Sequence, residues 1–257
     1  MPFFVPSALQ SPKALYLVPL FVGCGALVQA AAFWRGVQRA RTFAAQGRRF
    51  ERRSSEQGPR ILILGDSTGV GVGASRPEES IAGLLAADFP DADVVNVSES
   101  GAKVADTLAQ VRACAAQDLR FDLALLHVGG NDVVRSTPPA KLADDCEQLL
   151  QELGRLTERS LWLGPPNLGH APLFTPPFSW LVAARSRAAT AIFIDCAARH
   201  GVTFVNFSSP EHEARFVRAR AEHFAADRFH PSSSSYRYGW SVARSAVDLS
   251  AFATKTA

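Results

Sequence analysis

The chain has 257 residues, of which 47% are hydrophobic and 20% charged, a composition that fits one globular domain with an additional segment. Its net charge of +3 is unevenly spread: residues 1–57 carry eight basic and two acidic side chains, and the other 200 carry 19 and 22. Because the larger part is slightly acidic, the isoelectric point of 8.8 gives no support for a nucleic-acid partner.

Near the N-terminus, residues 14–34 form a stretch of 21 residues without a charged side chain. That length spans a hydrocarbon core of roughly 30 Å, and Tyr16 and Trp34 lie near its ends, where interfacial aromatic residues are common. We expect an N-terminal membrane helix. The alternative is a cleaved signal peptide with a site near Gln29–Ala32, although the stretch exceeds the usual h-region of ~7–15 residues.

The flanks of this stretch predict its orientation. Seven arginines lie between Arg35 and Arg53, against only Lys13 on the other side, so the positive-inside rule places the body in the cytoplasm; export is the alternative. The basic stretch either follows anionic headgroups as a helix or forms a solvated linker. We therefore expect a membrane anchor and a basic linker over residues 1–57 and a globular domain over residues 58–257.

From Arg60 onward, strand-like and helix-like stretches alternate. The predicted strands are Arg60–Leu64, Asp93–Val97, Leu123–Val128, Leu161–Leu163 and Val202–Phe207. The predicted helices are Glu78–Phe89, Val104–Gln117, Pro139–Leu156, Leu181–His200 and Tyr238–Phe252. Such alternation predicts an α/β fold with a parallel sheet and helices on both of its faces.

A candidate nucleophile follows the first strand. The apolar run Ile61–Leu64 predicts a strand buried on both faces, and Ser67 comes directly after its end. Ligands bind at this carboxyl edge in open α/β folds. Two alternatives remain at this point: Ser67 as a simple helix cap, or a nucleotide-binding loop formed by the glycines that follow it.

Three later stretches reach the same edge. Gly101 follows the second strand, Asn131 follows the third within Gly129–Asp132, and Asp227 stands three residues before His230. Residues three apart share a helical face, so the carboxylate can reach the imidazole and orient it as a base for a serine. Taken singly, these stretches could equally be two tight turns and a surface ion pair.

Together the four stretches resemble the SGNH, or GDSL, hydrolase family, in the family's own order. Gly65-Asp66-Ser67 matches the first block, Gly101 the second, Gly129–Asp132 (G-x-N-D) the third and Asp227–His230 (D-x-x-H) the last. The resemblance covers about residues 59–252. It implies a flavodoxin-like α/β/α sandwich with five parallel strands.

The resemblance also implies roles for these residues. Ser67 would be the nucleophile, His230 the general base and Asp227 its orienting partner. The oxyanion hole would consist of the N–H groups of Ser67 and Gly101 and the side-chain amide of Asn131. The expected reaction is hydrolysis of a carboxylic ester or thioester through an acyl-enzyme, without a metal or cofactor.

The substrate is less defined than the reaction. A small-molecule or lipid ester is expected, and a membrane anchor would suit a lipid. The same residues would serve an acyltransferase or a deacetylase. The proline-rich loop 164–172 and the aromatic residues after it either wall an acyl pocket or pack on the sheet. The sequence leaves the oligomeric state open.

Overall fold

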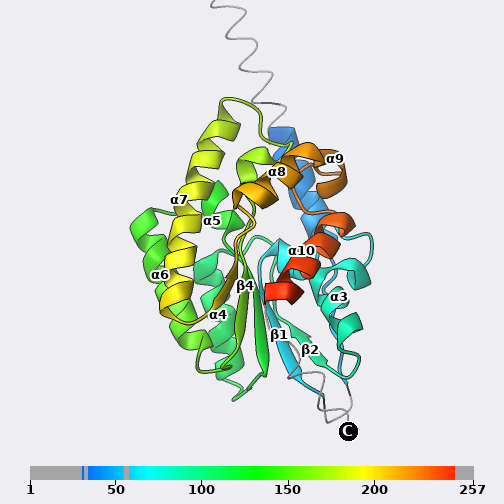
Figure 1. Cartoon of the computed structure of the whole chain (residues 1–257), viewed down its shortest axis with the longest axis vertical. Coiled ribbons are helices and arrows are strands. Elements are labelled where there is room, and N and C mark those ends of the chain that lie inside the picture. Colours follow the sequence, from blue (N-terminus) through cyan, green and yellow to red (C-terminus); the bar gives the residue numbers. More distant parts are fainter. Residues whose placement is uncertain (1–30, 32–33, 55–57, 247–257) are drawn as a thin grey trace, which may run out of the picture.

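A five-stranded parallel sheet forms the centre of the molecule (Figure 1). The computed structural model describes residues 31, 34–54 and 58–246. The strand order is β2-β1-β3-β4-β5, the order of flavodoxin-like folds. The strands are β1 (Arg60–Gly65), β2 (Asp93–Asn96), β3 (Leu123–His127), β4 (Ser160–Leu163) and β5 (Thr203–Val205). The predicted five-stranded parallel sheet is confirmed, and strand ends differ from the prediction by at most two residues.

Helices cover both faces of this sheet (Figure 1). They are α2 (Ser67–Val70), α3 (Ile81–Asp88), α4 (Val104–Ala115), α5 (Gly130–Val134), α6 (Pro139–Leu153), α7 (Phe178–Arg199), α8 (Pro210–Arg218), α9 (Arg220–His223) and α10 (Ser233–Ala246). One face is covered by α4, α6 and α7, and the other by α3 and α10. The result is the predicted three-layer sandwich.

Two hydrophobic cores lie between these layers. Successive side chains of a strand point to opposite faces, so Leu62 and Leu64 join the core under α4, α6 and α7. Ile61 and Ile63 join the core under α3 and α10. This double burial explains the uninterrupted apolar run of the first strand, since both faces of a central parallel strand are covered.

Several helix boundaries differ from the prediction. The helix expected to start at Glu78 begins at Ile81, because Ser80 caps it by accepting a hydrogen bond from the Gly83 N–H at 3.2 Å; a 3₁₀ turn precedes it. The last helix begins at Ser233 instead of Tyr238. Helices α8 and α9 were not predicted.

The predicted membrane segment, residues 14–34, lies outside the described residues apart from Ala31 and Trp34. Within the described part of the chain, no helix combines the length and the apolar composition needed to cross a bilayer. Residues 34–45 are helical. Further along, Arg52 forms an antiparallel bridge with Val94 at the sheet edge, with N–O distances of 3.0 and 2.7 Å. The division into residues 1–57 and 58–257 stays a prediction.

Candidate active site

The turn after β1 positions the predicted nucleophile. Gly65 has a φ of +133°, and a Cβ there would lie 1.9 Å from the His127 carbonyl oxygen, so only glycine fits. Asp66 then caps α2: its Oδ1 accepts a hydrogen bond from the Thr68 N–H at 2.8 Å. This sharp turn makes Ser67 the first residue of α2, at the carboxyl edge of the sheet.

Ser67, His230 and Asp227 form one hydrogen-bonded chain. The Ser67 Oγ lies 2.9 Å from His230 Nε2, and His230 Nδ1 lies 2.5 Å from Asp227 Oδ2. The other carboxylate oxygen, Asp227 Oδ1, accepts hydrogen bonds from the backbone N–H groups of Phe229 and His230 at 3.1 and 3.0 Å. The fold thus joins residues that are 163 positions apart.

The ionisation of Asp227 follows from its contacts. Burial favours the neutral form of Asp227, but hydrogen bonds from His230 and its charge outweigh burial and hold the pKa of that carboxyl below its usual value. An ionised Asp227 accepts the proton on His230 Nδ1 as a hydrogen bond, which leaves the lone pair of Nε2 directed at the hydroxyl of Ser67. A histidine held in this way can act as a base toward a serine hydroxyl.

The two other predicted residues lie near each other. Asn131, on α5, lines the same pocket as Ser67, and its Nδ2 donates to the carbonyl of Ala102 at 3.0 Å. Gly101, one residue earlier, has a φ of +89° in the turn after β2. Among the described residues, no backbone acceptor pairs with the N–H of Ser67 or Gly101.

Three further residues hold the site together, and the sequence analysis assigned them no structural role. Asn96 Nδ2 donates to the carbonyl of Gly69 at 2.9 Å and so fixes the end of α2. Asp132 Oδ2 accepts from the Val104 N–H at 3.0 Å, which joins α5 to α4. The Tyr236 hydroxyl donates to the Val72 carbonyl at 2.8 Å. Their partners are distant in sequence, so no local pattern reveals them.

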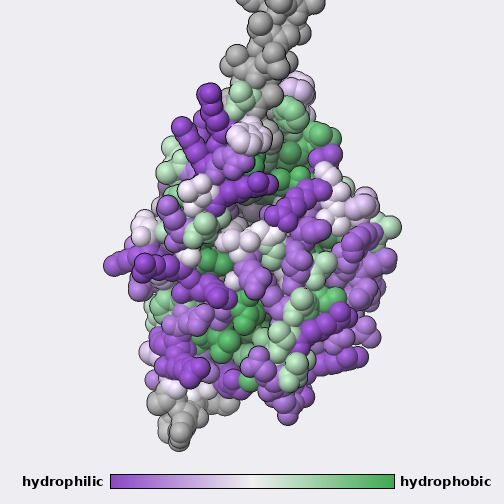
Figure 2. Space-filling model, turned by 180° about the vertical axis from the view of Figure 1, so that it is seen from behind, coloured by the Kyte–Doolittle hydropathy of each residue, from purple (hydrophilic) through white to green (hydrophobic). Residues whose placement is uncertain are grey.

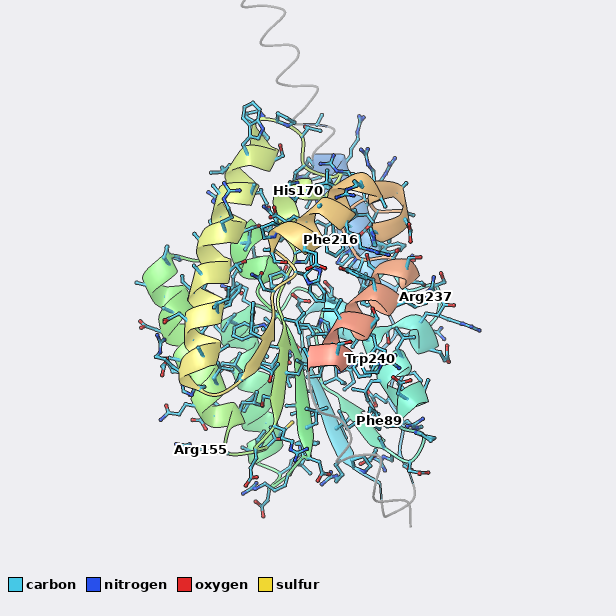
Figure 3. All side chains as sticks on the ribbon, in the orientation of Figure 1. Phe89, Arg155, His170, Phe216, Arg237 and Trp240 are labelled. Atoms are coloured by element: carbon cyan, nitrogen blue, oxygen red, sulfur yellow. The ribbon has the colours of Figure 1, made fainter. Side chains whose placement is uncertain are left out.

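An apolar pocket extends from the hydroxyl of Ser67 toward α8, α9 and α10. Counting the open solvent at its mouth, the empty space in this pocket amounts to about 900 Å³. Figure 3 shows Phe216 of this pocket on α8, with Trp240 of α10 on the same side of the sheet. The apolar walls include Ile81, Leu163, Phe207, Phe216, Phe224 and Phe229.

Buried titratable groups also line this pocket. Burial lowers the pKa of His127 from 6.5 to about 3 and lowers the pKa of His223 as well, so both imidazoles are neutral near pH 7. Within the described structure, neither Nε2 atom has a hydrogen-bond partner. Burial raises the pKa of Asp66 from 3.8 to about 6, although Thr68 partly offsets it.

A second group of ligand-type side chains lies between α6 and α7, away from the pocket. The ligand atoms of Glu147, Cys196 and His200 lie within 4.8 Å of one another. However, Glu147 already pairs with His200 at 2.7 Å and with Arg199 at 3.0 Å. Because a guanidinium holds the carboxylate, this group acts as an ion-pair link between two helices.

A sequence comparison agrees with this geometry. The model of the GDSL-like lipase/acylhydrolase family matches residues 63–238, which is more than half of the chain. The chain belongs to the GDSL-like lipase/acylhydrolase family. It is accordingly an enzyme that hydrolyses ester bonds, as the resemblance implied.

Individual relatives of this GDSL-like enzyme support the same conclusion. Esterase TesA of Pseudomonas aeruginosa is 32% identical over 142 residues, which cover 52% of this chain and 69% of TesA. A crystal structure of TesA superposes with a TM-score of 0.56 and 25% identity, covering 71% of this chain and 94% of that one. An α/β hydrolase from the metagenome of Lake Arreo has a TM-score of 0.58 at 20% identity, over 74% and 94%, and shares the fold.

Proposed function

We propose that this enzyme cleaves carboxylic esters or thioesters through an acyl-enzyme on Ser67. His230 is the general base and Asp227 its orienting partner. The observation that carries the proposal is the 2.9 Å contact between Ser67 Oγ and His230 Nε2, with Asp227 Oδ2 at 2.5 Å on the far side of the ring.

In the first step, Ser67 Oγ attacks the carbonyl carbon while His230 Nε2 takes the hydroxyl proton. The imidazolium that forms is stabilised by Asp227, whose second oxygen is fixed by two backbone N–H groups. His230 then returns the proton to the departing alkoxide or thiolate. Water, activated by the same nitrogen, hydrolyses the acyl-enzyme and restores Ser67.

The negative charge on the carbonyl oxygen needs preset donors. The N–H groups of Ser67 and Gly101 and the Asn131 amide supply them in this proposal. Asn131 donates one amide hydrogen to the Ala102 carbonyl, and its second amide hydrogen can be donated to the oxyanion. Each such donor is worth ~3–4 kcal/mol of transition-state stabilisation.

A panel of p-nitrophenyl esters of increasing chain length tests the proposal. Ser67→Ala should lower kcat by on the order of 10⁶ and abolish labelling by a fluorophosphonate probe. The matched control is Ser241→Ala, which removes an exposed hydroxyl on α10. Activity of Ser67→Ala within tenfold of the unmodified enzyme would rule out this nucleophile.

Acyl transfer would use the same residues, because the acyl-enzyme can be attacked by an alcohol or sugar hydroxyl in place of water. Product analysis with an added alcohol separates the two: a new ester as the main product identifies a transferase. Release of the free acid at an unchanged rate identifies the hydrolase that we propose. Release of acetate from acetylated sugars would identify a deacetylase.

We also propose that residues 14–34 tether the enzyme to a membrane with its body in the cytoplasm. The uncharged length of that stretch and the seven arginines after it support this placement. Protease added to intact spheroplasts should then leave residues 58–257 whole, and the enzyme should sediment with membranes. A mature N-terminus near Ala32, or digestion in intact spheroplasts, would favour export.

A further inference from the structure

Large hydrophobic side chains are exposed at the end of the molecule where α7 begins. Trp180 is 69% exposed, Leu181 47% and Phe178 46%, and Trp34 in the helix over residues 34–45 is 64% exposed. We call these four residues the aromatic end. Single exposed hydrophobic side chains are common, but a group of them gathered at one place marks an interaction surface.

The two segments that carry the aromatic end lie at the same end of the molecule. A Cβ on Gly36 would come within 2.3 Å of Leu173 Cδ1, so the helix over residues 34–45 packs on the loop that leads into α7. The ribbon shows residues 34–45 and the start of α7 at the same end (Figure 1). The space-filling view shows hydrophobic surface there (Figure 2).

The composition around the aromatic end matches a bilayer interface. Residues 171–184 contain no charged side chain and no histidine, and Trp34 ends the uncharged stretch 14–34. Exposed arginines follow at Arg35, Arg39 and Arg41. Tryptophan prefers the headgroup level, and arginine next to it binds anionic lipid at ~1 kcal/mol per residue. A protein partner would not require this order of apolar, aromatic and basic residues along the chain.

The loop that leads into α7 also lines the active-site pocket. Pro165, Pro166 and Leu168 are part of the pocket wall. Further along this loop, the Leu173 N–H donates to the Arg228 carbonyl at 3.0 Å. Phe174 packs at 88° against Phe229, with ring centroids 5.9 Å apart, and Phe229 lines the pocket. The aromatic end is therefore connected to the pocket wall through the loop before α7 and its contact with Phe229.

We propose that the aromatic end docks on an anionic lipid bilayer and that the pocket receives its substrate, an acyl ester of a membrane lipid, from that surface. The docking half stands alone, whereas the substrate half rests on the proposed function. Docking buries Trp180 and Leu181 in the interface and brings the loop before α7, which forms part of the pocket wall, close to the lipid. The apolar pocket walls then accept an acyl chain that never crosses water.

Fluorescence quenching tests the docking half on the full chain reconstituted into vesicles of phosphatidylcholine and phosphatidylglycerol. Of the four tryptophans, Trp162 and Trp240 are buried, at 0% and 5% exposure. In a Trp34→Phe variant, Trp180 is thus the exposed tryptophan. Lipids brominated on their acyl chains should quench its emission. If the brominated lipids do not quench this emission, the docking proposal is overturned, whether or not the protein self-associates as its concentration rises.

Activity on two substrates tests the second half. A Trp180→Ser/Leu181→Ser variant should hydrolyse a long-chain ester held in vesicles about tenfold more slowly, equivalent to ~1.4 kcal/mol, with unchanged activity on soluble p-nitrophenyl acetate. The control is Ile194→Ser, which removes another exposed apolar side chain (41% exposed) from α7, about 20 Å further along the helix at 1.5 Å per residue. It should change neither rate.

The outcomes separate the two proposals. If the soluble ester is cleaved but the vesicle ester is cleaved equally by all variants, the membrane-lipid substrate is wrong and the esterase stands. If neither ester is cleaved, the proposed function fails, and the substrate half fails with it. Quenching of Trp180 decides the docking half in either case.

Discussion

Gln110 on α4 pairs through both ends of its side-chain amide with the two backbone polar groups of Gly65. The Gly65 N–H donates to Gln110 Oε1 at 2.9 Å, and Gln110 Nε2 donates to the Gly65 carbonyl at 3.0 Å. All four groups are buried. Gly65 lies two residues before Ser67, so these two hydrogen bonds fix the end of β1 at which the turn to Ser67 begins.

Replacing Gln110 should cost stability and activity together. Gln110→Leu leaves the buried N–H of Gly65 without a partner, at ~1–3 kcal/mol, whereas the Gly65 carbonyl keeps the hydrogen bond from the Glu99 N–H at 2.9 Å. We therefore expect a loss of about 1–3 kcal/mol in the free energy of unfolding by urea. A displaced Ser67 should also lower kcat, since a shift of ~1 Å can cost ~10²-fold. Gln117→Leu, on an exposed glutamine, is the control and should change stability by less than ~0.5 kcal/mol.

The Asn131 amide is expected to act mainly in the transition state. Asn131→Ala should lower kcat by roughly 10²–10³ with a smaller change in KM, because the bond strengthens as the oxyanion forms. Asn131→Asp keeps the shape and replaces the donor with an acceptor, so it should be as inactive. A rise in KM at constant kcat would instead make Asn131 a residue that binds the ground state.

Much of the sheet was predictable because its signals are local. The run Ile61–Leu64 predicted a strand buried on both faces, which the structure confirms, and the residue types after three strands indicated the family. The site residues follow from this, since parallel strands bring their carboxyl ends to one edge. The hydrogen bond between Ser67 and His230 joins residues that are 163 positions apart. The resemblance implied this contact, whereas local spacing could not predict it.

Other features depend on contacts that no local pattern contains. Helix α8 is rich in charged residues and buries only Phe216, so its apolar signal is weak. Helix α10 starts within a run of serines that reads as a loop, yet Ser232 Oγ accepts a hydrogen bond from the Ser235 N–H at 3.2 Å and caps it. Gln110 shows no sequence signal, because its partner lies 45 residues away.

Asp66 should make the enzyme less stable as the pH rises. Burial raises its pKa from 3.8 to about 6, so the folded state binds the extra proton between these values and loses stability as pH rises through 6. The difference corresponds to ~3 kcal/mol. Asp66→Asn keeps the cap on Thr68 without a charge. Its stability relative to the unmodified enzyme should therefore increase from pH 4 to pH 7, measured by urea unfolding; a constant difference would contradict the buried acid.

His127 should have the opposite effect on the acid side. Burial lowers its pKa from 6.5 to about 3. Between these two pH values the imidazole is protonated in the unfolded chain and neutral in the folded chain. Stability contributed by the neutral ring is complete above pH 6.5 and is lost at ~1.4 kcal/mol per pH unit on acidification. His127→Leu should remove this slope between pH 6 and pH 4. The control is Ser98→Ala, which alters another buried side chain but no titratable group, and should keep the slope of the unmodified enzyme. If His127→Leu and the unmodified enzyme lose stability in parallel, His127 is protonated in the folded state, and its ring must have a partner or solvent contact that the fold described here does not provide.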